Sequence, residues 1–109
     1  MKAKFHYDNE TDNLIISTKA DNEKVRKNYM LDNFIFSLTG KGKIVGLEVN
    51  NVSELLNYSG FDSKILENIE GVELLTIPKK DSIFIGFFIK NNSKGARIPI
   101  THVPLACIN

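Results

Sequence analysis

The stretch from Ser82 to Lys90, SIFIGFFIK, predicts a strand that is apolar on both faces. Successive side chains of a strand point to opposite sides. One face therefore carries Ile83, Ile85, Phe87 and Ile89, and the other carries Phe84, Gly86 and Phe88. Burial of one phenylalanine is worth about 1.5 to 3 kcal/mol, against about 5 to 15 kcal/mol for the stability of a whole domain. The chain must therefore cover this strand on both sides.

Three arrangements would provide that cover. The β segments before and after the middle of the chain could stack within one molecule, the chain could form a homodimer, or another small protein could bind. A sheet that packs on helices through one face leaves its other face for a partner. We therefore take Phe84, Gly86 and Phe88 as the candidate interface.

The first half of the chain predicts five antiparallel strands. Alternating or β-branched residues mark the strands, turn formers separate them, and Asp32-Asn33 fits a two-residue turn. The strands are expected at residues 4–7, 13–18, 24–30, 34–39 and 44–49, in the order of a meander.

Two short helices are expected next. Asn51, with Glu54 three residues later, predicts a locally capped helix that ends near Gly60. Asp62 would cap a second helix that ends before Gly71, and both helices should lie on one sheet face.

The C-terminal part predicts three further strands at residues 72–78, 83–90 and 96–100. Pro99 cannot donate to a strand ladder and places the last strand at an edge. The expected fold class is α+β: an antiparallel β meander, two short helices, then a second three-stranded antiparallel β segment. The 109 residues should form a single domain, divided into 1–50, 51–70 and 72–109.

Composition narrows the class of partner. The net charge is +1 and basic residues alternate with acidic ones, so no nucleic acid is expected to bind. The chain has no apolar run of the roughly 20 residues that a membrane span needs, and MKAKFHYDNE turns acidic before a leader's apolar region, so we expect a cytoplasmic protein. The single cysteine, Cys107, fits a reducing compartment and a packed residue rather than a nucleophile.

The segment YDNETDNLII places Asp8, Glu10 and Asp12 at alternate positions, as a calcium loop would. The glycine and the closing glutamate of such a loop are replaced by Asn13 and Lys19. The favoured interpretation is a hairpin turn in which Asp8 and Asp12 accept hydrogen bonds from backbone N–H groups of the loop.

Other candidate ligands are isolated. His6 and His102 belong to no pair that would offer a metal two ligands on one element. No catalytic residue, metal ligand or cofactor is therefore assigned. The alternative from a different class is a divalent-metal-dependent enzyme or binder that uses Asp8, Glu10 and Asp12 of the acidic hairpin, with Glu48 as a further candidate ligand.

The segments YDNETDNLII and GKIVGLEVNNVSELL resemble a prokaryotic, archaeal-type family of domains of unknown function (DUF), whose pattern is YDxxxDxLYI followed by VGIEI. The matching residues are Tyr7, Asp8, Asp12, Leu14, Ile16, Gly42, Val45, Gly46, Glu48 and Ser53. Ile15 and Val52 depart from the pattern. The resemblance implies a small α+β protein without an assigned activity, sometimes encoded beside a toxin-like partner.

These observations favour a non-catalytic cytoplasmic protein that acts through protein contacts. A homodimer through Phe84, Gly86 and Phe88 is the leading hypothesis. The alternative partner is another small protein, for which this chain would be an antitoxin-like or regulatory subunit.

Overall fold

The computed structural model describes residues 3–91 and 94–104, and Cys107 lies outside them. Most of the described chain is β. Five strands precede the helical region: β1 (Lys4–Asp8), β2 (Asn13–Ser17), β3 (Val25–Leu31), β4 (Phe34–Thr39) and β5 (Ile44–Asn50). The helical region contains α1 (Val52–Tyr58) and a 3₁₀ helix, η1 (Ser63–Asn68). Three strands follow: β6 (Gly71–Pro78), β7 (Ser82–Asn91) and β8 (Lys94–Pro104).

The first five strands form one antiparallel sheet in the order β1-β2-β5-β4-β3. The predicted meander is therefore wrong at one step, because β2 pairs with β5 and not with β3. Burial explains why β5 and not β3 lies next to β2: five of the seven residues of β5 are buried, whereas five of the seven residues of β3 are exposed. The apolar strand takes the centre and the polar strand takes an edge.

The connection between β2 and β3 is tied to the turn between β4 and β5. In this connection the Glu23 carboxylate accepts a hydrogen bond from the Ala20 backbone N–H at 2.8 Å and pairs with Lys43 at 2.9 Å. These contacts hold the pKa of Glu23 below its usual range, the Ala20 bond being the main cause. This connection joins two strands, β2 and β3, that are separated in the sheet by β5 and β4.

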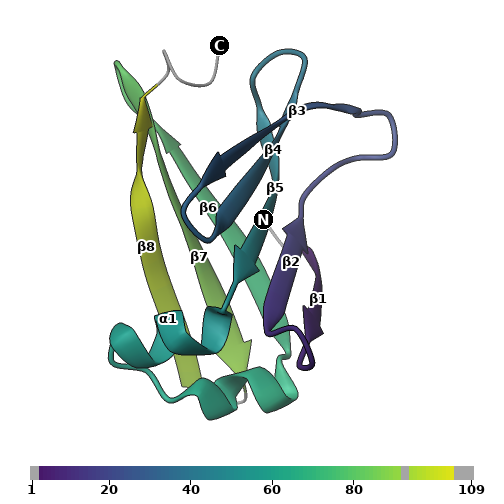
Figure 1. The fold of residues 1–109 in the computed structure, drawn as a ribbon. Helices are drawn as coiled ribbons and strands as arrows, with labels where there is room; N and C mark the ends of the chain where they lie inside the picture. Colours follow the sequence, from purple (N-terminus) through teal and green to yellow (C-terminus); the bar gives the residue numbers. More distant parts are fainter. Residues whose placement is uncertain (1–2, 92–93, 105–109) are drawn as a thin grey trace.

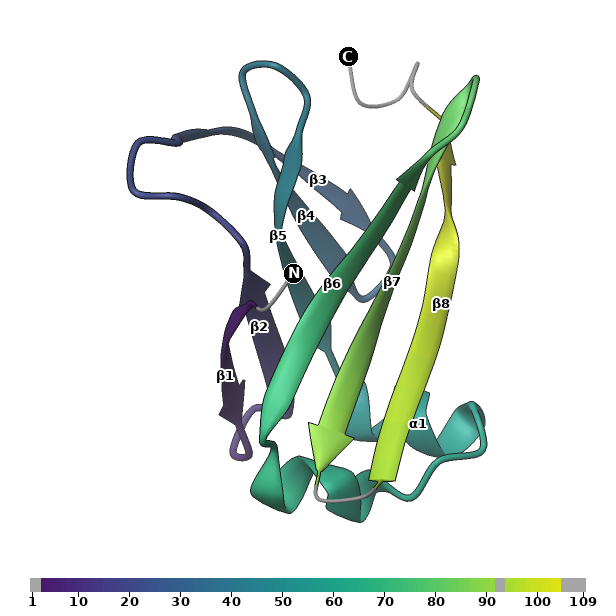
Figure 2. The same ribbon diagram turned by 180° about the vertical axis from the view of Figure 1, so that it is seen from behind.

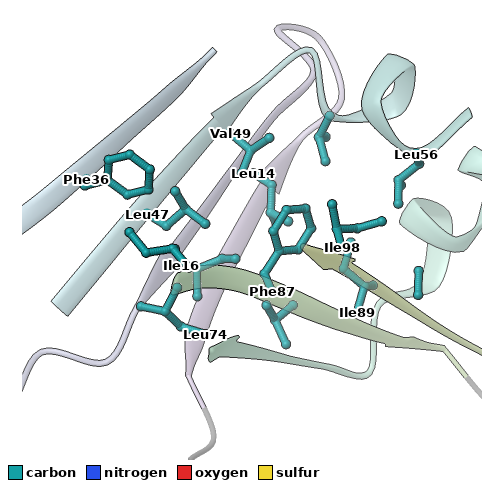
Figure 3. Close-up of a cluster of buried hydrophobic side chains, with 14 of the residues drawn as sticks. Leu14, Ile16, Phe36, Leu47, Val49, Leu56, Leu74, Phe87, Ile89 and Ile98 are labelled. Carbon is teal, nitrogen blue, oxygen red and sulfur yellow. The ribbon is translucent and has the colours of Figure 1, made fainter. Parts of the chain in front are cut away.

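The remaining strands form a second antiparallel sheet in the order β6-β7-β8. The last strand lies at an edge, as Pro99 predicts. This sheet stacks against the five-stranded one, as the two views in Figures 1 and 2 show. Side chains of both sheets form one hydrophobic core, in which Phe87 of β7 lies close to Leu14 and Ile98 (Figure 3).

The helical region closes one end of the two stacked sheets rather than covering a sheet face, which corrects the sequence-based expectation (Figure 1). The reason is that the inner faces of the sheets already cover each other. Val52 and Leu56 of α1 and Ile65 and Leu66 of η1 complete the core at this end. The second helix is a six-residue 3₁₀ segment, and the Asp62 side chain caps it by accepting the Lys64 N–H, as predicted. No helix of the described residues is long and apolar enough to cross a membrane.

Stacking settles which face of β7 is covered within the chain. Ile85, Phe87 and Ile89 are fully buried between the sheets. Phe84 and Phe88 lie on the outer face and are half-buried. The two β segments therefore do stack within one molecule, but they leave the candidate interface on the outside.

Candidate functional site

The acidic hairpin is joined to the start of α1 through Asp12. One carboxylate oxygen of Asp12 accepts the Tyr7 hydroxyl at 2.8 Å, and the other accepts the Ser53 hydroxyl at 2.6 Å. The carboxylate also accepts the Ser53 backbone N–H at 3.2 Å, and the Asp12 carbonyl accepts the Val52 N–H at 3.1 Å. We call this set of contacts among Tyr7, Asp12, Ser53 and Val52 the Asp12 latch.

The Asp12 latch corrects two sequence-based interpretations. Asn51 makes no side-chain cap and has a left-handed backbone, with φ of 56°. The first N–H groups of α1, which have no partner within the helix, are instead satisfied by Asp12 from a distant hairpin. The predicted turn role holds for Asp8, whose carboxylate accepts the Glu10 N–H at 2.9 Å, but Asp12 bonds to the helix rather than to its own loop.

The electrostatics of the Asp12 latch suit a structural role. Burial, with the hydrogen bond to Asp12 next, raises the pKa of Tyr7 to about 12. The Tyr7 phenol therefore stays protonated and donates at neutral pH. The Ser53 hydroxyl also donates to a carboxylate, an arrangement that lacks the imidazole or amine base which activates a serine nucleophile. The bond from the Glu10 N–H is the main cause that lowers the pKa of Asp8.

The acidic residues do not converge on a cation site. Both Asp12 oxygens already accept hydrogen bonds within the Asp12 latch. Glu48 lies on β5, opposite Ile15 and Ile35 of the neighbouring strands, so it belongs to the outer face of the sheet and not to the hairpin turn. Among the described residues, no three His, Cys, Asp or Glu side chains are grouped as metal ligands. His6 lies in β1, and the side chain of His102 is outside the described part.

A groove of about 690 Å³ lies between the hairpin and η1. Phe5, His6 and Tyr7 of β1 form one wall, and Ser63, Leu66 and Glu67 of η1 form the other. We call it the η1 groove. Its volume is within the range of small-ligand and peptide sites, and its walls mix apolar and polar side chains. Sequence analysis missed this groove because β1 and η1 are far apart in the chain.

The predicted interface residues lie on the outer face of the three-stranded sheet, on its central strand. Phe84 is paired with Ile77 of β6, and Phe88 is paired with Glu73 of β6 and Arg97 of β8. Gly86 lies between the two phenylalanines. We call the surface formed by Glu73, Leu75, Ile77, Phe84, Gly86, Phe88 and Arg97 the outer face of the small sheet.

Neighbouring residues cover part of Phe88. The Phe88 ring lies over Gly95, where a Cβ atom would be 2.7 Å from the ring. The guanidinium carbon of Arg97 is 5.9 Å from the ring centre, within the range of a cation–π contact. These contacts explain why Phe88 is half-buried without a partner molecule. Ile77, on the same face, is 48% exposed.

Together these features define a small antiparallel β protein of two stacked sheets, closed at one end by short helices. Residues 4–53 match the family model described as "Protein of unknown function (DUF2283)", a segment that covers the five-stranded sheet and ends at Ser53. The chain is also 34% identical over 83 residues to the uncharacterized protein MJ0789 of Methanocaldococcus jannaschii, covering 76% of this chain and 68% of that protein. The chain therefore belongs to this family of uncharacterized proteins. No solved structure matches it significantly.

Proposed function

We propose that the chain is a non-catalytic binding module that acts through protein contacts and forms a homodimer through the outer face of the small sheet. The observation that carries this proposal is the apolar centre of that face. Leu75, Phe84 and Phe88 are half-buried there, and Ile77 is 48% exposed. Because the opposite face of β7 is already buried between the sheets, a second molecule is what we propose covers the part of this face that the described residues leave exposed.

Charge placement on the same face supports a two-fold dimer. Glu73 and Arg97 flank Phe88 on opposite sides, since both pair with it across the sheet. In a two-fold interface the same patch meets itself. Arg97 of one protomer can then approach Glu73 of the partner subunit while the apolar centres pack together, which favours self-association over two like-charged faces.

The chemistry of the Asp12 latch supports the non-catalytic part of the proposal. Its hydroxyl groups donate to a carboxylate that also accepts from the start of α1. These bonds hold the hairpin on the helix. A role for Tyr7, Asp12 and Ser53 in positioning secondary structure accounts for each of their contacts.

The test is size-exclusion chromatography with light scattering on the whole chain, together with Ile77→Glu and Phe88→Glu. Wild-type protein should elute as a dimer, and each variant should elute as a folded monomer because a charged carboxylate would have to leave water at the apolar centre of the interface. Ile15→Glu is the matched control, since Ile15 is 44% exposed on the outer face of the other sheet. A monomeric wild type, or dimers that survive both substitutions, would contradict the proposal.

A further inference from the structure

The edge of β1 that faces away from β2 borders the η1 groove. Phe5, His6 and Tyr7 all line that groove, although neighbouring side chains of a strand point to opposite faces. A groove that touches three consecutive residues must run along the strand's edge. Its far wall is formed by η1, including Leu66 and Glu67.

Backbone groups of β1 point into this space. Residues of an antiparallel strand alternate in the direction of both their N–H and C=O groups. The N–H of Ala3 donates to the carbonyl of Val72 on β6 at 3.2 Å, away from β2. Phe5 and Tyr7, two and four residues further along, direct their backbone groups to the same side. They therefore offer two donors and two acceptors along the groove.

The other three sheet edges carry features that block strand pairing. The edge strand β3 has a bulge between Val25 and Lys27 and is rich in charge. Pro99 lies in β8, and Pro78 ends β6. Such bulges, charges and prolines are how β proteins prevent unwanted pairing at an edge. The edge of β1 has neither a bulge nor a proline, and its two charged residues, Lys4 and Asp8, lie at its two ends.

The charge along the groove indicates the chemistry of the partner. Glu67 is exposed at its wall and has no cationic partner among the described residues. Asp8 and Glu10, at the neighbouring hairpin, add two more carboxylates, against the two lysines of β1 and η1, Lys4 and Lys64, so the net charge beside the groove is negative. We propose that the edge of β1 binds an extended, basic peptide segment of another protein, which adds a strand beside β1 through Phe5 and Tyr7 and places its cationic side chains near Glu67 and Asp8.

The pairing has a definite register. Phe5 and Tyr7 have their side chains on the core-facing side of the sheet, since they pair with Ile16 and Leu14. Cross-strand neighbours share a face, so the peptide residues opposite Phe5 and Tyr7 should be apolar and those between them basic. This surface is separate from the outer face of the small sheet, so its occupancy does not depend on dimer formation.

The probe is an end-capped seven-residue peptide in which valine and lysine alternate, titrated into the ¹⁵N-labelled whole chain. Amide signals of Phe5, Tyr7 and the η1 segment should shift, whereas those of β3 and β8 should not. Two N-methylated peptides supply a matched pair. Methylation of the valine amides should weaken binding about tenfold or more, because the residues opposite Phe5 and Tyr7 donate these amides to β1 when the peptide is antiparallel to it. Methylation of the lysine amides, which face away, should change it by less than about threefold.

Variants of the protein test whether Glu67 attracts the basic peptide and whether a peptide is the occupant of the β1 edge. Glu67→Lys should weaken binding about threefold or more, whereas Glu54→Lys, an exposed carboxylate of α1 outside the groove, should leave it unchanged. Equal binding of the two methylated peptides, or shifts that map to another surface, would overturn strand addition at β1. If the peptide bound Glu67→Lys as tightly as the wild type, the assignment of a basic peptide as the occupant would be overturned. Shifts of Phe5 and Tyr7 that follow protein concentration without peptide would identify a second copy as the occupant instead.

Discussion

The carboxylate of Asp12 connects two residues that lie 41 positions apart, since it accepts both the hydroxyl and the N–H of Ser53. Asp12 also has a left-handed backbone, with φ of 58°, which asparagine tolerates better than most residues. Asp12→Asn therefore tests the loss of one acceptor oxygen without added backbone strain. We expect the free energy of unfolding to fall by about 1 to 2 kcal/mol, because one partly buried donor loses its charged acceptor.

Chemical denaturation of Asp12→Asn measures this loss, and Asp8→Asn is the control. Asp8 ends β1 at the same hairpin turn, but its carboxylate accepts the exposed Glu10 N–H and not a donor of α1. Its substitution should change stability by less than about 0.5 kcal/mol. Equal effects of the two substitutions would show that Asp12 acts only as a turn residue.

Tyr7 makes the stability of the fold sensitive to alkaline pH. Its pKa is raised from the ordinary 10.0 to about 12, first by burial and then by the hydrogen bond to Asp12. The folded state therefore holds the phenol proton more tightly than the unfolded chain does. The stability from this group is fully present below about pH 10 and is lost as pH rises towards about 12. In denaturation curves at stepwise pH, Tyr7→Phe should lose stability less steeply over this window than the wild type, and identical slopes would contradict the role of Tyr7.

At the scale of the elements, the small sheet depends on a close approach between β7 and β8 at Gly86. A Cβ atom there would be 2.8 Å from the backbone carbonyl oxygen of Ile98, which cannot move without shifting the strand. Gly86→Ala should therefore lower the free energy of unfolding by about 1 to 3 kcal/mol. The control is Gly71→Ala in β6, where a Cβ meets nothing within 4 Å. A thermal melt of both variants checks the difference, and an unaffected Gly86→Ala would show that β8 can shift.

Local patterns of the sequence predict well where the strands and helices lie, but they predict poorly which strands pair with each other. Alternation placed β4 and β5 within a residue or so of their observed bounds, and Asp62 caps η1 as expected. The pairing of β2 with β5 depends on which strand is most apolar, a comparison across the whole chain. The predicted cap of α1 is wrong for a similar reason. Asn51 directly precedes the helix and fits the local pattern, but the hydrogen bonds come from Asp12, which is distant in the sequence.

The two candidate surfaces differ in how far local sequence patterns predict them. The two-sided apolar pattern of β7 predicts that Phe84, Gly86 and Phe88 share one apolar face, because the alternation of a strand is a local property. It could not show which face the first sheet would cover. The η1 groove could not be predicted at all, since its walls come from β1 and η1 and meet only when the helical region closes the end of the sheets.

At the scale of the whole molecule, the two sheets share one core, to which both contribute buried side chains. Phe87 is fully buried in that core, close to Leu14 of the other sheet (Figure 3). The five-stranded sheet, although it nearly coincides with the matched family segment, would expose Leu14 and Leu47 if it stood alone. The sheets should therefore unfold together rather than as separate units.

Phe87→Ala tests this coupling. Truncation of a fully buried phenylalanine costs about 3 to 5 kcal/mol. Hydrogen exchange should show the same loss of protection for amides of β2 and β5 as for those of β7, because opening either sheet exposes the shared core. Ile15→Ala, on the outer face, should leave protection in both sheets nearly unchanged. If Phe87→Ala lowered protection in the small sheet alone, the five-stranded sheet would be an independent folding unit and the shared core would not govern its stability.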